Sequence, residues 1–290
     1  MNKEKNALLE MGVVDSRRII YTPSDFARSS LLHLQEVGSL VARLPHTSAR
    51  SGLASYLFFI VDDGEGEVEY GGERYHLKRD DCFFIDCRHP YLHRTDEHLW
   101  RIRWAHFYGP NMGAIYDKYV SRGGRPVFRA KEADALRDIV DTLYEVASGT
   151  GHVKDIEIQE RLSALLVLLM QASGYEREDG WVGKTAELQR IKEYLDGHYT
   201  EKITLDALQE RFFINKYYLL EIFKREYGMG IGQYLIHMRI TKSKGLLRFT
   251  DKTVEEIAYA SGMNSPHYFS RIFKRVEGVS PSEYRKIWVK

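Results

Sequence analysis

The last hundred residues of the chain contain a duplicated pattern, and this repeat limits the possible folds more than any other feature. The segment YLLEIFKR at 218–225 recurs fifty positions later as YFSRIFKR at 268–275, and a glycine follows each copy. A solenoid needs about three or more repeats to bury its stacked faces. Two copies therefore predict a pair of similar folding units in the carboxyl-terminal part of the chain.

Each unit is predicted to be a short helix, a tight turn and a second helix. The segment TLDAL at 204–208 precedes the first copy, and TVEEI at 253–257 precedes the second at nearly the same distance. The apolar residues of both copies recur at helical spacing. A further helix over 231–247 joins the two units. The expected result is an all-α domain of two helix-turn-helix units.

The second unit carries the clearer signals for helix ends. Thr253 can cap the first helix, with Glu256 at the spacing of a capping box. Gly262 stands where the turn needs a positive φ. Asn264 or Ser265 can cap the second helix, and Pro266 fits its first turn because a missing N–H costs nothing there. The segment SPSE at 280–283 starts a closing helix by the same rules.

The second helix of this unit has one apolar and one polar face. Helical spacing predicts a buried stripe of Phe269, Ile272, Phe273 and Val276. The opposite face carries groups suited to base edges or phosphates, and the candidates for DNA contact are His267, Ser270, Arg271, Lys274 and Arg275. Arginine binding guanine is the commonest specific contact in the major groove, so Arg271 is the expected base reader. A polar face exposed to solvent is the alternative, and the duplication and the basic surroundings weigh against it.

The matching face of the first unit is less basic. Its candidate DNA-contacting residues are Lys216, Tyr217, Leu220, Glu221, Lys224 and Arg225. Glu221 can accept a hydrogen bond from a cytosine amino group, but phosphates repel it. This helix is therefore expected to bind more weakly, or to be more restricted in sequence, than its counterpart. Helix N-termini and the basic pairs 224–225 and 274–275 would hold the phosphates.

The charge of the chain is divided unevenly between its two parts. The formal net charge is +1, but residues 184–290 contain 19 Lys and Arg against 13 Asp and Glu, so the remainder of the chain is acidic. A basic carboxyl-terminal part fits contact with a polyanion. Such an excess is also common in proteins that bind no nucleic acid, so it only indicates where to look.

The amino-terminal part, to about Pro110, reads as strands and turns. Residues 57–61 form an apolar run of strand length, and Gly71-Gly72 separates two alternating segments in a hairpin pattern. Another strand is expected at 82–85. Along 100–107, Trp100, Ile102, Trp104 and His106 occupy every second position, so one face of this strand is expected to be aromatic and apolar. Several short strands at such spacing predict a sandwich or a small barrel.

The pattern becomes helical at Ala130. Apolar residues recur at helical spacing over 136–147 and again over 156–170, with a glycine-containing break between the two segments. The polar stretch 173–185 fits a linker. The predicted organisation is a domain over 1–172, a linker over 173–185 and a second domain over 186–290. The fold class is α+β.

Other classes of protein fit the sequence poorly. No apolar run reaches the length of a membrane span, and Met1–Met11 has no leader-like apolar core, so export is not expected. The two cysteines, Cys82 and Cys87, are too few to staple a chain of 290 residues, and both are expected to be reduced in the cytoplasm.

The carboxyl-terminal residues resemble a known family. The segment VEEIAYASGMNSPHYFSRIFKRVEGVSPSEYR closely resembles the signature of the AraC/XylS family of bacterial transcription regulators, and ITLDALQERFFINKYYLLEIFKREYGMGIGQYLIHMRI resembles that family's first helix-turn-helix unit. The departures lie mostly in the first unit: Gln209 replaces a small residue, Phe213 a turn glycine and Gly230 a serine cap. The resemblance implies a DNA-binding regulator that contacts double-stranded DNA and RNA polymerase.

The amino-terminal part resembles, less specifically, the cupin-like sensor domain of sugar-responsive members of this family. The segments that carry the likeness are LKRDDCFFIDCRHPYLHRT and LWRIRWAHFYGP. The resemblance implies a cupin-like β-barrel or jelly roll that holds an effector, followed by two helices that form a homodimer. The apolar stripes of the segments 136–147 and 162–169 suit dimerisation, and packing against the barrel is an alternative of nearly equal weight.

A sugar site combines aromatic faces with a few hydrogen-bonding groups. Candidates for the effector pocket are His46, Arg50, Tyr56, His93, Trp100, Trp104 and His106. Tyr91 competes with His93 for a place at the rim. Each of these residues could instead be an ordinary hydrogen-bonded core residue, so the prediction concerns the cluster and no single member.

Two rival functions remain open. The chain could be a carbohydrate-binding cupin whose tail is an interaction domain, or a metal-dependent cupin enzyme. For a metal, Cys82, Cys87, His89, His93 and His106 lie near one another in sequence, but the short His-x-His spacing of metal-binding cupins is absent. No phosphate loop, nucleophile elbow or HExxH helix occurs. The prediction is a cytoplasmic, dimeric transcription activator that responds to a carbohydrate, with no catalytic residue, metal or cofactor.

Overall fold

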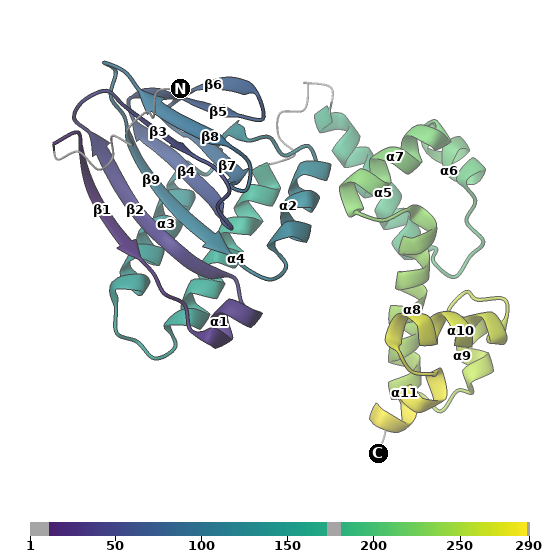
Figure 1. Cartoon of the computed structure of the whole chain (residues 1–290). Helices are drawn as coiled ribbons and strands as arrows, with labels where there is room; N and C mark the ends of the chain where they lie inside the picture. The colour runs from purple at the N-terminus through teal and green to yellow at the C-terminus, as the bar shows by residue number, and fades with distance from the viewer. Residues whose placement is uncertain (1–11, 173–180, 289–290) are drawn as a thin grey trace. The chain divides into compact units, whose positions relative to one another are not determined.

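A computed structural model describes residues 12–172 and 181–288 (Figure 1). The chain divides into two compact units, Met1–Glu176 and Arg177–Lys290. The strands and first helices of unit one are β1 (Val14–Ile20), α1 (Asp25–Ser30), β2 (His33–Ala42), β3 (His46–Arg50), β4 (Tyr56–Asp63), β5 (Glu65–Tyr70), β6 (Glu73–Lys78), β7 (Asp81–Asp86), β8 (Tyr91–Thr95), β9 (Arg101–Tyr108), α2 (Met112–Ser121), β10 (Val127–Arg129), α3 (Ala133–Ser148) and α4 (Lys154–Ala172).

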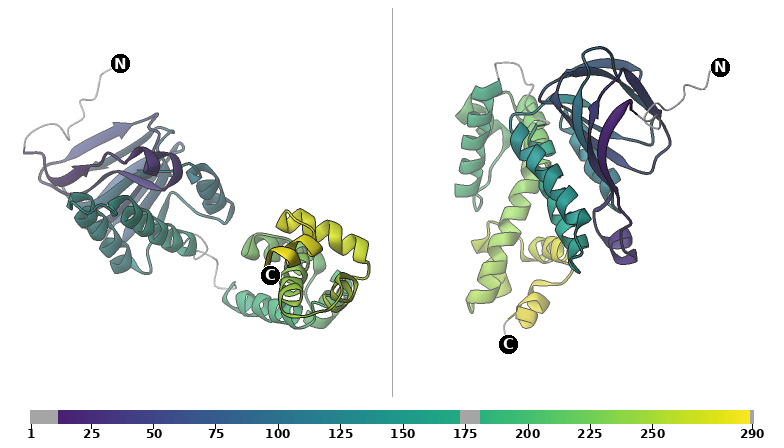
Figure 2. Two further views of the ribbon diagram at one scale, coloured as in Figure 1. Left: turned by 90° about the horizontal axis from the view of Figure 1, so that it is seen from below. Right: turned by 90° about the vertical axis from the view of Figure 1, so that its left-hand side faces the viewer.

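The first unit is a sandwich of two antiparallel sheets covered by helices on one side (Figures 1 and 2). The larger sheet has the strand order β1-β2-β9-β4-β7-β10, and the smaller has the order β3-β8-β5-β6. Every strand pair is antiparallel. Such a double-sheet arrangement is the jelly-roll solution to closing a small β domain. The predicted cupin-like fold is confirmed.

The strand predictions are confirmed where the local signals were strong. The apolar run 57–61 lies inside β4, and the segment 82–85 lies inside β7. The hairpin of β5 and β6 turns at Gly71 and Gly72, whose φ angles of 62° and 84° are the positive values that this two-residue turn requires.

Two apolar cores fill the first unit, one on each side of the larger sheet. Phe59, Phe83 and Trp100 pack between the two sheets, against side chains of β5, β6 and β8. Phe58 and Phe84 point the other way, toward the helices. Strands that are buried on both faces have no alternation of polar and apolar residues. Their sequence therefore does not show which residues face the other sheet and which face the helices.

The apolar stripes of α3 and α4 pack against the larger sheet. Leu136, Val140 and Leu143 of α3 and Leu162 and Leu165 of α4 are buried in the core that they share with β2, β4, β7 and β9. The prediction that these stripes form a dimer interface is therefore wrong. The alternative, packing within the subunit, holds because the outer face of the larger sheet is as apolar as its inner face.

Three short elements and part of the linker differ from the sequence prediction. Helices α1 and α2 and strand β10 were not anticipated, since each is short and has no clear periodicity. Residues 173–180 of the predicted linker 173–185 lie outside the described residues. Residues 1–11, which were not expected to be an export leader, lie outside them as well. Residues 181–185 begin a helix instead, because one internal glycine costs only about 1 kcal/mol.

The second unit is all α-helical and contains the two predicted helix-turn-helix units. Its helices are α5 (Trp181–Gly197), α6 (Leu205–Phe212), α7 (Lys216–Tyr227), α8 (Ile231–Phe249), α9 (Val254–Ala260), α10 (Pro266–Glu277) and α11 (Pro281–Trp288). Ile231 and Leu235 of α8 pack in the core of α5–α7, whereas Ile240 and Leu247 pack in the core of α9–α11. Helix α8 thus joins two separate small cores, as predicted.

Candidate nucleic-acid interface and effector pocket

Helix α10 is delimited at both ends by its own sequence. The Ser265 hydroxyl accepts a hydrogen bond from the backbone N–H of Tyr268 at 3.2 Å, and Pro266 occupies the first turn. Gly278 ends the helix in the left-handed conformation, with φ of 80°. The predicted caps are confirmed, with Ser265 rather than Asn264 as the N-cap.

The helix before it starts with the predicted capping box. The Thr253 hydroxyl accepts from the Glu256 N–H at 3.1 Å, and the Glu256 carboxylate accepts from the Thr253 N–H at 2.7 Å. Gly262 then turns the chain with φ of 78°. A methyl group at this glycine would lie 2.5 Å from the Thr200 Cα, so the turn needs glycine for space as well as for φ.

The buried face of α10 is one residue shorter than predicted. Phe269, Ile272 and Phe273 are buried against α8, α9 and α11. Val276 is 37% exposed, so its assignment to the buried stripe is wrong. The helix ends at Glu277, and Val279, just beyond the helix, packs against this core in place of Val276.

The outward face of α10 presents cations that are free to bind. His267, Arg271, Lys274 and Arg275 are exposed, and Ser270 is half-buried beside them. Within residues 12–172 and 181–288, none of the four basic side chains is in an ion pair. The guanidinium of Arg271 lies over the ring of Tyr268, with its central carbon 5.6 Å from the ring centroid. This row of unpaired donors suits a polyanion that also offers base edges.

The turn before α7 also contains a left-handed residue, but this residue is not a glycine. Phe213 adopts the left-handed conformation with φ of 54°, in the place that Gly262 takes in the second unit, and its side chain is 95% exposed. The Asn215 side chain caps α7 by accepting from the N–H groups of Tyr217 and Tyr218 at 3.0 and 3.3 Å.

The outward face of α7 is mixed in charge. The Lys216 ammonium lies 2.7 Å from the Asp206 carboxylate, and this hydrogen bond raises the pKa of Lys216. Tyr217, Glu221 and Lys224 are exposed, so they remain available. The other two candidates are half-buried: Leu220 packs against the core of α5–α8, and Arg225 lies partly inside the helical bundle.

The space between the two sheets of the first unit contains a cavity of about 40 Å³. Four of the predicted pocket residues, Arg50, His93, Trp104 and His106, line it together. They come from β3, β8 and β9, whose alternating residues point inward. The other lining residues are Arg18, Glu36, Leu40, Leu57, Phe59, Tyr91 and Ile102.

Two further candidates lie just behind this cavity. The ring of His46 is 6.4 Å from that of His93, and the ring of Trp100 is 5.9 Å from it, measured between centroids. Neither lines the cavity itself. The His46 Nε2, the His93 Nδ1 and the Trp100 Nε1 are all buried with no hydrogen-bond partner in the described part of the chain. Buried polar atoms of this kind ordinarily have a partner.

Tyr56 also lies outside the cavity, on the helix-covered side of the larger sheet. Its ring packs against Tyr116 of α2, with centroids 5.3 Å apart, and its hydroxyl accepts from the Arg88 guanidinium at 3.1 Å. Residues 57 and 59 of the same strand face the inner core, so Tyr56 faces the helices. The prediction failed because β4 is apolar on both faces and its register was not evident.

The two cavity histidines are neutral at neutral pH. Burial is the main cause that lowers the pKa of His93 to about 3, and His46 and Arg50 contribute to the same shift. Burial lowers the pKa of His106 to about 4, again with a contribution from Arg50. The His106 Nδ1 is 3.0 Å from the Ser55 hydroxyl. Neutral imidazoles can both donate and accept hydrogen bonds, as hydroxyl recognition requires.

Three polar residues of the cavity were missed or left undecided by the sequence. Arg18 of β1 and Glu36 of β2 lie 3.5 Å apart as an ion pair at the cavity. Both belong to strands that carry no sequence signal for a site, and only the sheet order brings them to His93. Tyr91 lines the cavity beside His93, so the two do not exclude each other.

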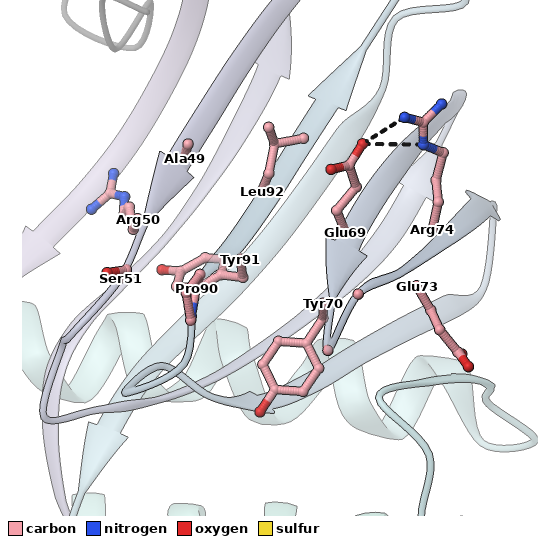
Figure 3. Close-up of a pocket in the computed structure, with 12 residues that line it drawn as sticks. Ala49, Arg50, Ser51, Glu69, Tyr70, Glu73, Arg74, Pro90, Tyr91 and Leu92 are labelled. Atoms are coloured by element: carbon pink, nitrogen blue, oxygen red, sulfur yellow. Dashed lines mark hydrogen bonds and ion pairs between the residues drawn. The ribbon is translucent and has the colours of Figure 1, made fainter. Parts of the chain in front are cut away.

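An open hollow of about 770 Å³ adjoins the cavity at one end of the smaller sheet (Figure 3). Arg50 and Tyr91 line both spaces. Figure 3 shows the two side chains on neighbouring strands at the rim, apart from the Glu69–Arg74 ion pair on the other side of the hollow. Arg50 and Tyr91 therefore mark where the cavity meets the surface.

The cysteines are free and lie on opposite faces of the larger sheet. Cys82 packs with the helices, and Cys87 packs between the sheets. Burial raises the pKa of the Cys87 thiol to about 12. In the residues that the structure describes, no three His, Cys, Asp or Glu side chains are grouped closely enough to hold a metal ion. No described helix has the length and apolar character needed to cross a membrane.

Comparison with known proteins agrees with both units. Residues 42–166 match the family model of an AraC-like ligand-binding domain, and residues 208–287 match that of a helix-turn-helix domain. This chain belongs to the AraC family of transcription regulators. The first match contains the strands around the cavity, and the second contains both outward helices of this AraC-family protein.

Individual relatives match over different lengths. YijO of Escherichia coli K12, an HTH-type transcriptional regulator by name, is 35% identical over 35% of this chain and 36% of its own length. The first relatives are thus matched over only about a third of their length. RhaS of Salmonella agona, an HTH-type transcriptional activator by name, is 27% identical over 78% of this AraC-family chain and 84% of its own.

Among solved structures, the C-terminal domain of AraT, a response regulator from Geobacillus stearothermophilus, is 32% identical. The match covers 35% of this chain and 84% of that domain, with a TM-score of 0.34.

Proposed function

We propose that this AraC-family protein is a sequence-specific DNA-binding transcription activator whose action is controlled by a carbohydrate effector. The helical unit binds duplex DNA, and the β unit binds the effector. The protein acts in the cytoplasm, where it meets the chromosome and RNA polymerase.

The outward face of α10 carries this proposal. Its exposed basic side chains have no acidic partners in the described part of the chain, although acidic residues are frequent elsewhere in the protein. A guanidinium flanked by an imidazole and a hydroxyl can read base edges, while Lys274 and Arg275 can hold phosphates. Because a second outward helix, α7, belongs to the same unit, each subunit can offer two helices to successive turns of the major groove, roughly 34 Å apart.

The cavity of the β unit supports a carbohydrate as effector. Trp104 and Phe59 offer apolar faces, and His93, His106 and Tyr91 offer hydrogen-bonding groups. Such a mixture is typical of small-molecule sites with polar ligands. The buried His93 Nδ1, which has no partner in the described residues, would gain a hydrogen bond from a hydroxylated ligand.

Activation and dimerisation rest on the family. RhaS, which matches over most of its length, is named an activator. A homodimer would place two double helix-turn-helix units on repeated half-sites. The dimer would use a surface other than the apolar stripes of α3 and α4, because those stripes are buried within the subunit.

The proposal is tested by DNA binding across a salt series. A duplex selected from a random library by the full chain should bind much more tightly than a scrambled duplex, and binding should weaken steeply as salt rises because counterions are released. Fluorescence anisotropy or mobility shift measures both effects. Equal binding of selected and scrambled duplexes would contradict the proposal.

A further inference from the structure

Arg50 lies at the mouth of the cavity, and no described residue pairs with its charge. It ends β3, directly opposite Tyr91 of β8, and it lines the cavity together with His93 and His106. Its side chain is in no hydrogen bond or ion pair within residues 12–172 and 181–288. Most arginines of this unit are paired: Arg88 with Asp86, Arg103 with Asp62 and Asp141, and Arg137 with Asp62, Asp80 and Asp134.

The other charges of the cavity do not compensate Arg50. Glu36 is the acidic residue among the lining side chains, and it lies 3.5 Å from Arg18. These two charges offset each other. His93 and His106 are neutral, and the Arg50 charge helps to keep them so. The inner cavity therefore carries one positive charge in excess, whereas the adjoining hollow is also lined by Glu69, Glu73 and Arg74.

Neutral hydrogen-bonding groups surround this excess charge. The Tyr91 hydroxyl is buried without a hydrogen-bond partner among the described residues, although the Cys87 thiol, a weak acceptor, lies close to it. The His93 Nδ1 likewise has no partner in the described residues. A buried polar group left without a partner is destabilising, and a ligand with hydroxyl groups would supply the missing hydrogen bonds.

The narrow cavity and the wide hollow suggest how such a ligand would lie. The inner space of about 40 Å³ admits only a small part of a molecule, whereas the hollow of about 770 Å³ leaves room outside. Arg50 and Tyr91 stand where the two spaces meet. An anionic group at this boundary would reach the guanidinium, while hydroxyl groups would point inward to the imidazoles.

We propose that the effector is an acidic sugar, whose carboxylate pairs with Arg50 and whose hydroxyl groups bind Tyr91, His93 and His106. The inference rests on the proposed function, and it names the chemical class of the ligand. A guanidinium binds a carboxylate through two parallel hydrogen bonds, which gives both strength and orientation. A neutral sugar could offer Arg50 hydroxyl oxygens as acceptors, but it would leave the positive charge unneutralised.

The test compares acidic and neutral sugars that differ in one group. Titration calorimetry on the full chain uses D-glucuronate and D-galacturonate as probes, with D-glucose and D-galactose as their neutral counterparts. Glucose 6-phosphate distinguishes a carboxylate from a phosphate. The acids should bind at least about tenfold more tightly than the neutral sugars, since a hydrogen bond between two charged groups is stronger than one to a neutral hydroxyl. If glucose 6-phosphate binds more tightly than both acids, the assignment of a carboxylate to the ligand is overturned.

Three variants locate the effect at Arg50. Arg50→Gln should weaken binding of the acidic sugars about tenfold or more, so that they are no longer preferred over the neutral sugars. Arg50→Lys should keep the preference at reduced affinity, because the charge stays while the planar fork is lost. Arg101→Gln removes the same charge from an exposed position of β9 outside the cavity, so it should change nothing. If Arg50→Gln does not fold, as judged by its thermal unfolding, the lysine variant decides.

The outcomes separate this inference from the proposed function. Tighter binding of neutral sugars, no binding of either acid at millimolar concentration, or unchanged acid binding in Arg50→Gln would overturn the acidic-sugar assignment. DNA binding is measured separately on the same protein. If a neutral sugar alters DNA binding, the proposed function stands and the acidic-sugar inference fails. If the acids bind but the protein does not bind DNA, the inference stands and the proposed function fails.

Discussion

The two helix-turn-helix units share a scaffold and differ in the surface they present. Their second helices bury matching triads, Leu219, Ile222 and Phe223 in α7 and Phe269, Ile272 and Phe273 in α10. Their turns reach the same left-handed conformation, at Phe213 in one unit and at Gly262 in the other. The duplicated buried residues keep the fold, so the outward residues are free to diverge.

The outward residues have diverged in charge. Arg271 of α10 has Glu221 as its counterpart in α7, fifty positions earlier. Lys216 of α7 is held by Asp206, whereas the cations of α10 have no acidic partner in the described residues. From this difference we expect α10 to supply most of the DNA affinity. Helix α7 is expected to add fewer phosphate contacts and to recognise a more restricted set of bases.

The turns provide the largest expected difference between the units. Gly262→Ala should destabilise α9 and α10 by about 2–4 kcal/mol, because the residue must stay left-handed and its methyl group would meet the Thr200 backbone. Phe213→Gly should change stability by less than about 1 kcal/mol, since relief of strain and the greater freedom of the unfolded chain offset each other.

Hydrogen exchange of the backbone amides measures each unit separately. Gly262→Ala should lower protection in α9 and α10, and Phe213→Gly should leave α6 and α7 nearly unchanged. Equal losses in both variants would mean that the two turns are equivalent.

Removing the matched outward side chains sharpens the contrast in charge. Arg271→Ala should cost about 1–3 kcal/mol of binding to the selected duplex and relax preference at one base pair, whereas Lys274→Ala should weaken all sequences alike. Glu221→Ala should strengthen binding to random DNA, because a charge that repels phosphates is removed. Anisotropy titrations against single-base variants of the duplex report all three. If Arg271→Ala weakens every sequence equally, Arg271 does not read bases.

The first helices of the two units should differ in their caps. Thr253→Ala should destabilise the second unit by about 1–2 kcal/mol, because it breaks a reciprocal capping box. Thr204→Ala should cost about 1 kcal/mol or less of stability, because Thr204 makes only one capping hydrogen bond, from the Ala207 N–H. The side chain of Ala207 has no acceptor for the Thr204 N–H, so there is no reciprocal bond to lose. Hydrogen exchange of α9 and α6 is the readout, and Glu255→Ala is the control on an exposed neighbour. A larger loss from Thr204→Ala would reverse this ranking.

The smallest expected effect concerns Lys216. Asp206→Asn releases its ammonium from the 2.7 Å contact, so binding to DNA should tighten by about two- to fivefold and depend slightly more on salt. The same anisotropy titration detects it. Weaker binding would show that Asp206 positions Lys216 for DNA rather than withholding it.

The sequence predicted the helical unit far better than the effector cavity. Caps such as Thr253, Ser265 and Pro266 act on residues within four positions, so their effect can be read locally. Val276 was misplaced because the end of the core depends on neighbouring helices. Tyr56 was misplaced because both faces of its strand are apolar.

The partners in the cavity could not be read from the sequence. Arg18 and Glu36 reach His93 only through the order of strands in the two sheets. Whether the apolar stripes of α3 and α4 pack within the subunit depends on whether the outer face of the larger sheet is apolar. That property follows from the register of its strands, which the sequence does not show. Long-range pairing therefore limits prediction of the cavity, whereas the helical unit depends on short-range signals.

The central claim is that α7 and α10 both enter the major groove of DNA. Protection of guanine N7 from dimethyl sulfate, measured on the selected duplex with the full chain bound, tests it most directly. Two protected segments about one helical turn apart should appear per subunit, and Arg271→Ala should remove protection in one of them only. Sequence-specific binding with no protected guanine in guanine-containing half-sites would contradict the claim.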